Sequence, residues 1–139
     1  MTRLIVLDAS VALTWCFEDE VTDDSVRLLD EMKQCAIVVP ALWHVELANT
    51  LVQGAKRGRI NDAAIAEFDQ LVRDLRVQTD HALSQAGLGP LVGLARRHGL
   101  SAYDATYLEL AMRLNATLAT HDAALCRAAE AAGIAVFAT

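Results

Sequence analysis

The sequence predicts an α/β fold, a three-layer α/β/α sandwich built around a short parallel sheet. Short apolar runs alternate with longer helical patterns along the chain, and the runs lack the apolar–polar alternation of strands with one wet face. The composition is 54% hydrophobic over 139 residues, with only 7 Gly and 2 Pro. These observations favour one compact domain that spans residues 1–139.

Four apolar or β-branched runs are expected to form the strands. They are RLIVL (3–7), AIVV (36–39), ATLAT (116–120) and IAVF (134–137). Helical patterns are expected at 11–17, 22–33, 42–56, 61–76, 82–98, 102–115 and 123–132. Gly99 and Gly133 follow the ends of two of these helices, as terminating glycines do. The 76-residue interval between the second and third runs is almost entirely helical, which predicts an added helical hairpin near one end of the sheet.

Asp104 lies in the stretch SAYDATYLEL (101–110), which has the pattern of a helix start. At about 100° per residue, its helix face is shared by four apolar or aromatic residues, namely Tyr107, Leu108, Ala111 and Met112. Asp104 is therefore expected to point inward. Ser101, three residues earlier, offers a local explanation as half of a capping box. A buried carboxylate needs a compensating partner, and that face has no basic residue, so the partner must come from elsewhere in the chain.

Two more aspartates stand at the carboxyl ends of expected strands. Asp8, in LDAS, is the first polar residue after the first run, and Asp122, in LATHD, has the equivalent place after the third. Ligands of open parallel sheets bind outside the carboxyl ends of the strands. Each aspartate is also a common helix cap, but two at equivalent positions indicate an acidic rim. Ser10 and Thr120 are expected to support this rim by orienting carboxylates or ligand waters.

Glu46, in PALWHVELANTL, shares a helix face with Asn49, Thr50 and Gln53. A polar stripe facing solvent is one interpretation of this pattern. Solvent-facing stripes usually carry lysine or arginine, however, and this one has neither. The pattern therefore favours short polar side chains, Asn49 among them, that surround one functional acid.

The four acids Asp8, Glu46, Asp104 and Asp122 come from separate segments, each at a strand end or in the helix that begins near one. Crowded like charges repel unless a cation offsets them, so their convergence predicts a divalent-metal site. Oxygen ligands without histidine or thiolate favour Mg²⁺ or Mn²⁺ over zinc. In this hypothesis the same four acids are the metal ligands and the catalytic residues.

The net charge of −6 is unusual for a protein that binds a polyanion, but four acids in one metal site would account for most of it. Basic residues cluster in AKRGRI (Lys56, Arg57 and Arg59) and in ARRHG (Arg96 and Arg97). Such clusters are often only solvated helix ends. They are also the candidates for contacts with phosphates.

Nothing in the sequence predicts contact with a membrane. No apolar stretch approaches the roughly 20 residues of a membrane span, and the amino-terminal segment meets Asp8 too early for a signal peptide. The three cysteines are scattered and lack the spacing of a disulfide framework or a zinc site. We therefore expect a cytoplasmic protein.

In these segments the sequence resembles the PIN-domain family, and within it the VapC-type ribonuclease toxins of bacterial toxin–antitoxin pairs. The matching pieces are LDAS, ELAN, SAYDATYLELA and LATHD, and they occur in the family's order. Any one of these pieces is common by chance. The ordered set of four in a chain of this length is much more specific, and the resemblance covers the whole sequence.

The resemblance implies a PIN-like fold, endoribonuclease activity with Mg²⁺ or Mn²⁺, a homodimer, an RNA substrate and inhibition by a cognate antitoxin protein. Carried over position by position, it gives an acidic site and three supporting residues: Asp8, Glu46, Asp104 and Asp122, with Ser10, Asn49 and Thr120. Many relatives place a further acid after the last motif, where this chain has Ala123, Ala124 and Leu125. Whether one or two metal ions bind without substrate therefore stays open.

Three other interpretations are less consistent with the motifs. A magnesium-binding regulatory domain such as a phospho-receiver would need adjacent acids after the first strand and a lysine at a later strand end, and the sequence has neither. A phosphatase with an aspartate nucleophile would need a second aspartate where Ser10 stands. A non-catalytic interaction domain of the same fold remains an alternative, although the four acids favour the nuclease.

Overall fold

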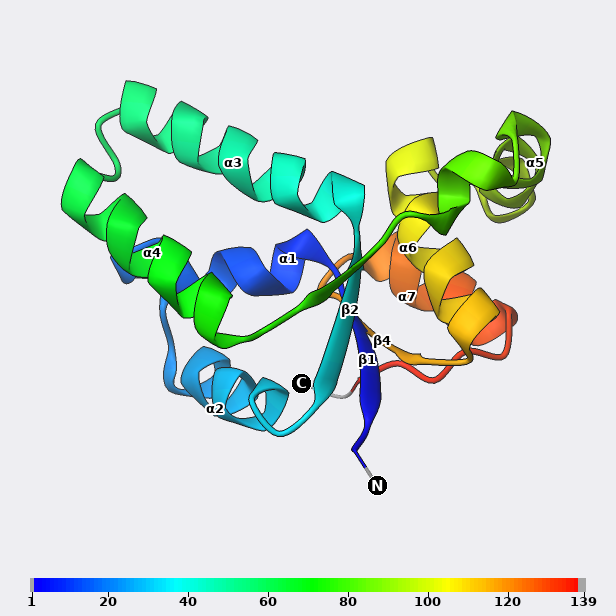
Figure 1. Ribbon diagram of the computed structural model, residues 1–139, viewed down its shortest axis with the longest axis horizontal. Helices are drawn as coiled ribbons and strands as arrows, with labels where there is room; N and C mark the ends of the chain where they lie inside the picture. The colour runs from blue at the N-terminus through cyan, green and yellow to red at the C-terminus, as the bar shows by residue number, and fades with distance from the viewer. Residues whose placement is uncertain (1, 138–139) are drawn as a thin grey trace.

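The computed structural model describes residues 2–137, and a four-stranded parallel sheet lies at its centre (Figure 1). The strands are β1 (Leu4–Leu7), β2 (Ala36–Pro40), β3 (Gln78–Asp80) and β4 (Thr117–Ala119), in the order β3-β2-β1-β4. β1 is central, since it pairs with β2 on one side and β4 on the other. Their carboxyl ends consequently share one edge. The predicted α/β class is confirmed.

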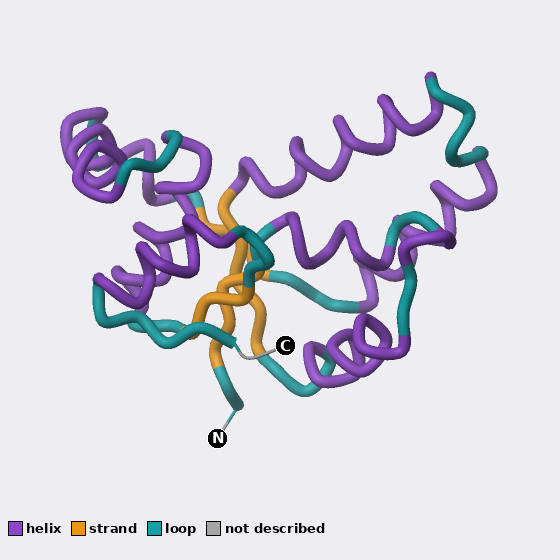
Figure 2. Tube along the Cα trace, turned by 180° about the vertical axis from the view of Figure 1, so that it is seen from behind, coloured by secondary structure: helices purple, strands orange, loops and turns teal. Residues whose placement is uncertain are grey.

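Helices connect the strands and cover both faces of the sheet. They are α1 (Ala9–Ala12), α2 (Asp23–Met32), α3 (Ala41–Lys56), α4 (Asp62–Asp74), α5 (Leu88–His98), α6 (Ala102–Leu114) and α7 (Ala123–Ala131), with 3₁₀ turns η1 (Leu13–Trp15), η2 (Glu18–Glu20) and η3 (Ala82–Gln85). Helices α1 to α4 lie on one side of the strands and α5 to α7 on the other, as Figures 1 and 2 show from opposite directions. No helix of the described chain has the length and apolar character that crossing a membrane requires.

Two strand predictions need correction. The run 134–137 is wrong as a strand of the sheet, because only the single bridge Leu118↔Val136 links it to β4. Conversely, the interval predicted to be helical contains β3, which is short and lies at the edge of the sheet. Its sequence QTD is polar and carries no apolar signal. Its pairing with the carboxyl half of β2 makes it a strand.

Two helix predictions also differ from the structure. The segment predicted as one helix from 82 to 98 is divided into η3 and α5 by Gly87, whose φ of +78° is not helical. The segment predicted as a helix from 11 to 17 is the short α1 followed by η1. The predicted hairpin is present as α3 and α4, which project together from the sheet (Figure 1).

Helix α6 packs between α5 and the sheet, so it is buried on more than one face. Tyr107, Leu108 and Ala111 are completely buried, as the helical spacing predicted. Met112, expected on the same face, is 41% exposed, whereas Thr106 on the opposite face is buried. Burial on two faces explains why a single inward stripe describes this helix incompletely.

Candidate active site

Asp8 and Asp122 lie together at the carboxyl edge of the sheet because β1 and β4 are neighbours. Leu7 pairs with Ala119, and the backbone amide of Asp8 donates to the Ala119 carbonyl at 2.9 Å. The chain beyond each strand then turns into a helix, α1 after Asp8 and α7 after Asp122. Two segments more than 100 residues apart in the sequence thus reach the same place.

Asp8 is 5% exposed and is held by two hydroxyl groups. Ser10 Oγ donates to Asp8 Oδ2 at 2.7 Å, and Thr120 Oγ1 donates to the same oxygen at 2.5 Å. Ser10 and Thr120 are the hydroxyl residues that the sequence placed beside the rim. Asp8 occupies the N-cap position of α1 without making a side-chain cap bond. Its carboxylate is therefore fixed by these hydroxyls and not by the helix.

Asp122 and Asp104 both stand at helix starts. Asp122 Oδ1 accepts from the Leu125 amide at 2.8 Å and so caps α7, while the Asp122 amide donates to Thr120 Oγ1 at 3.0 Å. Ser101 Oγ accepts from the Asp104 amide at 3.1 Å and caps α6. Asp122 and Ser101 thus cap these two helices, and the bond to its own Oδ1 fixes the carboxylate of Asp122.

Glu46 meets a partner that the sequence did not identify. The Tyr107 hydroxyl donates a hydrogen bond to Glu46 Oε1. Tyr107 is completely buried, and its burial and the Glu46 carboxylate raise the pKa of its hydroxyl far above the usual range. A tyrosine one helical turn after an inward aspartate was a signal, but helical spacing alone assigned it to the core.

The four acids are close enough to repel one another. Burial raises the pKa of Glu46, with the charges of Asp8 and Asp104 adding to the rise and the Tyr107 hydrogen bond opposing it. Burial likewise raises the pKa of Asp104, and Asp122 and Asp8 add to that rise. Each acid therefore interacts with at least one other. A like-charged, half-buried cluster of this kind is the electrostatic pattern of a cation or catalytic site.

The carboxylate oxygens of the four acids suit a hard cation, but the side chains do not yet converge on one position. Within residues 2–137, no three His, Cys, Asp or Glu side chains are placed so that they could hold a metal ion as they stand. The four carboxylates, of which Glu46 and Asp104 have raised pKa values, remain oxygen donors of the kind that Mg²⁺ and Mn²⁺ prefer. Binding would require a side-chain adjustment, and the field of a cation would drive it by removing the repulsion.

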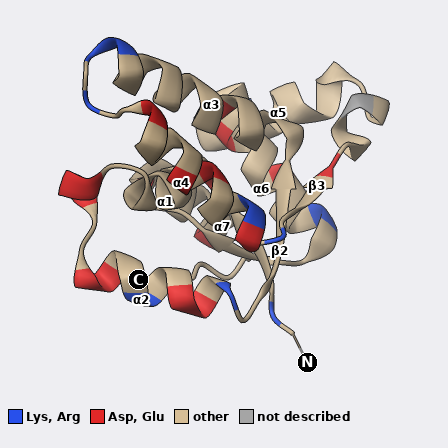
Figure 3. Ribbon diagram, turned by 60° about the vertical axis from the view of Figure 1, so that its left-hand side comes forward, with Lys and Arg blue, Asp and Glu red and all other residues tan. Residues whose placement is uncertain are grey.

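The remaining candidates are exposed on α3, just after it and on α5. Asn49 is exposed on α3, and Lys56 is ten residues beyond Glu46 on the same helix, or about 15 Å along its axis. Lys56 and Arg57 are exposed where α3 ends, and Figure 3 shows positive charge at the tip of the α3–α4 hairpin. Arg96 and Arg97 are exposed in the last turn of α5.

Arg59 is engaged with its own chain. Its guanidinium lies 3.2 Å from Asp19 and 3.6 Å from Glu20, and it stacks 4.0 Å from the centroid of the Phe17 ring. These contacts tie the α3–α4 turn to η2. Arg59 thus has a structural role that the basic cluster in the sequence did not reveal.

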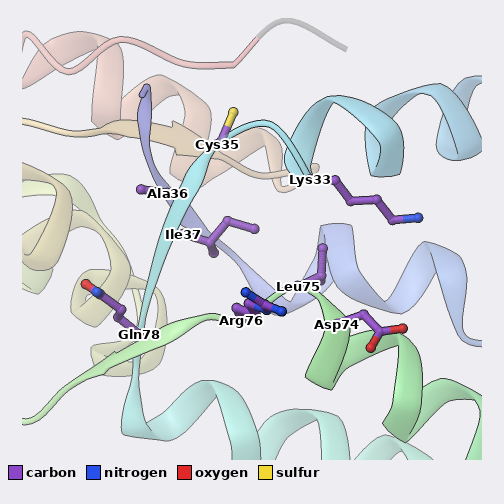
Figure 4. Close-up of a pocket in the computed structure, with 8 residues that line it drawn as sticks. All are labelled: Lys33, Cys35, Ala36, Ile37, Asp74, Leu75, Arg76 and Gln78. Carbon is purple, nitrogen blue, oxygen red and sulfur yellow. The ribbon is translucent and has the colours of Figure 1, made fainter. Parts of the chain in front are cut away.

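A cavity of about 610 Å³ lies at the other end of the sheet (Figure 4). Its lining includes Cys35, Ala36 and Ile37 at the amino end of β2, and Leu75 and Arg76 just after α4. Because the strands are parallel, the amino end of β2 is opposite the edge that carries Asp8 and Asp122. This cavity is therefore not part of the acidic cluster.

Comparisons with known proteins agree with this geometry. A family model described as "PIN domain" matches residues 5–131. The chain is 27% identical over 119 residues to Ribonuclease VapC3 of Pyrobaculum aerophilum, covering 85% of this chain and 88% of the relative. It also resembles the crystal structure of PAE2754 from Pyrobaculum aerophilum, with a TM-score of 0.67 and 23% identity over 92% of this chain and 87% of that one.

A third relative is a structure of VapBC2 from Rickettsia felis bound to a DNA fragment from their promoter. The TM-score is 0.62 and the identity 18%, covering 86% of this chain and 87% of that one. At such identities the structural likeness supports the fold alone.

Proposed function

Because this chain belongs to the PIN-domain family, we propose that it is a Mg²⁺- or Mn²⁺-dependent endoribonuclease and the VapC-type toxin of a toxin–antitoxin pair. The observation that supports the proposal most is the mutual repulsion of Asp8, Glu46, Asp104 and Asp122 at one edge of the sheet. Protein cores rarely gather acids unless a cation or a reaction uses them. The similarity to a protein named Ribonuclease VapC3 supports the choice of RNA.

The proposed reaction is hydrolysis of a phosphodiester bond. Asp8, Glu46, Asp104 and Asp122 would hold the divalent cation, which when bound would make a water more acidic and offset the negative charge that develops on the phosphate oxygens. The chain would contribute the geometry. Ser10 and Thr120 hold Asp8 in one orientation, and the capping bonds of α6 and α7 place Asp104 and Asp122. We propose these four acids, Glu46 included, as the cation ligands.

Substrate contacts would come from the surface around the cluster. Asn49 is exposed on the helix of Glu46, so we propose that it supports the site by hydrogen bonding to RNA or to a ligand water. Lys56, Arg57, Arg96 and Arg97 are exposed and would contact phosphates away from the cleaved bond. Such contacts position a nucleic acid without reading its sequence.

The proposed partners are a cognate antitoxin and a second copy of this chain, in the cytoplasm where the RNA lies. A structural relative was solved as VapBC2 with a promoter DNA fragment, which supports a protein partner of this kind. Expression of the chain alone should arrest growth, and an Asp8→Asn variant should not. Light scattering of the purified protein should give a mass near 30 kDa, twice the 15.0 kDa of one chain. A mass of one chain would contradict the homodimer.

The activity is tested with purified protein and a mixed RNA pool, with and without a chelator. We expect cutting that requires Mg²⁺ or Mn²⁺ and falls by about 100-fold or more in Asp8→Asn and Asp104→Asn, since each removes a charged ligand. Glu67→Gln, on the exposed side of α4, is the matched control and should cut normally. Cutting that survives chelation, or that both asparagine variants retain, would reject the mechanism.

One observation keeps a second function in view. Residues 2–137 contain no three His, Cys, Asp or Glu side chains placed to hold a metal ion as they stand, and a non-catalytic interaction domain of the same fold would need none. In that case the protein would bind its partner or RNA without cutting it at any metal concentration. The same cleavage assay at about 10 mM Mn²⁺, a concentration above most dissociation constants of such sites, separates the two functions.

A further inference from the structure

We propose that Tyr107 is a positioning residue of the acidic site, whose buried hydroxyl joins the helices that carry Glu46 and Asp104 and fixes the Glu46 carboxylate. The inference rests on the proposed function, because it concerns how Glu46 is presented to a cation. It assigns a task to a side chain that helical spacing placed in the core.

The hydroxyl of Tyr107 links two helices of the site. It donates its one proton to Glu46 Oε1, 61 positions away in the sequence. One hydrogen bond thus connects α3, which carries Glu46, to α6, on which Asp104 also lies.

The ring is held as firmly as the hydroxyl. Tyr107 has no exposed surface and packs within the main hydrophobic core with Leu108 and Val6. A fully buried ring has few alternative rotamers, so its hydroxyl is a fixed point. Glu46, by contrast, is a long and only half-buried side chain with several rotatable bonds.

Without this bond Glu46 would turn away from the other acids. Asp8 and Asp104 both repel it, and solvent is within its reach. The hydroxyl holds Oε1 and leaves the second carboxylate oxygen, Oε2, for a cation. Groups that orient a metal ligand in this way commonly change metal affinity or activity by about 10–100-fold when they are removed.

The test is Tyr107→Phe, which removes one oxygen and keeps the buried ring. Binding of Mn²⁺ is measured without RNA, from the electron paramagnetic resonance signal of free Mn²⁺, for wild type, Tyr107→Phe and Glu46→Gln. Tyr103→Phe is the matched control, because Tyr103 lies on the same helix but is 64% exposed. Thermal unfolding and RNA cleavage are recorded for the same proteins.

We expect the dissociation constant for Mn²⁺ to rise about 10-fold or more in Tyr107→Phe and in Glu46→Gln, with Tyr103→Phe unchanged. For RNA cleavage we expect the Mn²⁺ concentration that gives half the maximal rate to rise by a similar factor, with saturating Mn²⁺ restoring the rate, which a loss of folded protein would not produce. Glu46→Asp provides a second variant, because its shorter side chain keeps the charge but draws the carboxylate back from the Tyr107 hydroxyl. It should weaken Mn²⁺ binding in the same direction.

Equal or tighter Mn²⁺ binding by Tyr107→Phe, beside a loss in Glu46→Gln, would overturn the positioning role and leave the proposed function intact. If Tyr107→Phe does not fold, Glu46→Asp decides by the same criterion. Failure of the wild-type protein to bind Mn²⁺ would overturn both proposals together.

Discussion

Replacement of Asp104 by asparagine is expected to raise the free energy of unfolding of the metal-free protein while it abolishes cleavage. The pKa of Asp104 is raised by burial and by the charges of Asp122 and Asp8, so its ionised form costs more in the folded chain than in the unfolded one. Asparagine has nearly the same shape and no charge. The variant should therefore lose function and gain stability.

The size of the effect follows from Coulomb's law. Two unit charges about 6 Å apart repel by about 0.7 kcal/mol in bulk water and by about 2.8 kcal/mol at an effective dielectric constant of about 20. Asp104 is half-buried, so its environment lies between these limits. We expect a gain of about 1–2 kcal/mol, or about 3–8 °C in Tm for a domain of this size.

The pH dependence has a definite sign. The folded pKa of Asp104 is above its ordinary value of 3.8, so folding favours the protonated acid, and this contribution is present at low pH and is lost as pH rises through the folded pKa. Wild type and variant should therefore be similarly stable near pH 3. The advantage of the variant should appear above that pKa and persist at pH 7.

The assay is thermal unfolding by circular dichroism between pH 3 and 8, in the presence of a chelator, with Glu67→Gln as the exposed control. A second series with Mn²⁺ should stabilise wild type more than the variant, because ligand binding to the folded state adds to stability. An unchanged or lower Tm of Asp104→Asn at pH 7 would refute the claim that these acids repel one another.

Three further predictions concern the framework of the site. Arg113→Met removes two hydrogen bonds to Asp80 at the end of β3 (3.1 and 2.7 Å). Urea denaturation should show that the free energy of unfolding falls by about 1–2 kcal/mol. A loss of stability that disappears only at high salt would point to long-range charge instead. Gly54→Ala should lower the Tm, although alanine gains about 1 kcal/mol in helix propensity over glycine. A Cβ at this position would lie 2.9 Å from the Phe17 ring, and overpacking of this kind costs about 1–3 kcal/mol. A higher Tm would contradict this reasoning. Burial, aided by the charge of Glu20, raises the pKa of the Cys16 thiol to about 11. After iodoacetamide treatment at pH 8, mass spectrometry should find Cys16 the slowest of the three cysteines to react. Early labelling of Cys16 would refute its burial.

The sequence pointed to the four candidate acids and to Ser10 and Thr120, but not to Tyr107. Asp8 and Asp122 could be predicted at the sheet edge because strands that are buried on both faces are apolar. The first polar residue after such a strand therefore marks the edge of the parallel sheet. The sequence pointed to Asp104 because a charged residue is unexpected on an otherwise apolar helix face. The polar edge strand β3 offered no such signal, since three residues owe their conformation to a neighbour and not to their own composition.

The amino-acid sequence by itself determined the fold class, most helices and the residues that need an explanation, because hydrophobic periodicity and helix capping act over a few neighbouring positions. Only the tertiary structure decided which side chains meet. The bond from Tyr107 to Glu46 joins residues 61 positions apart, and Arg59 belongs to Asp19 across 40 positions. Such pairings depend on the strand order and on helix packing, which no local pattern encodes.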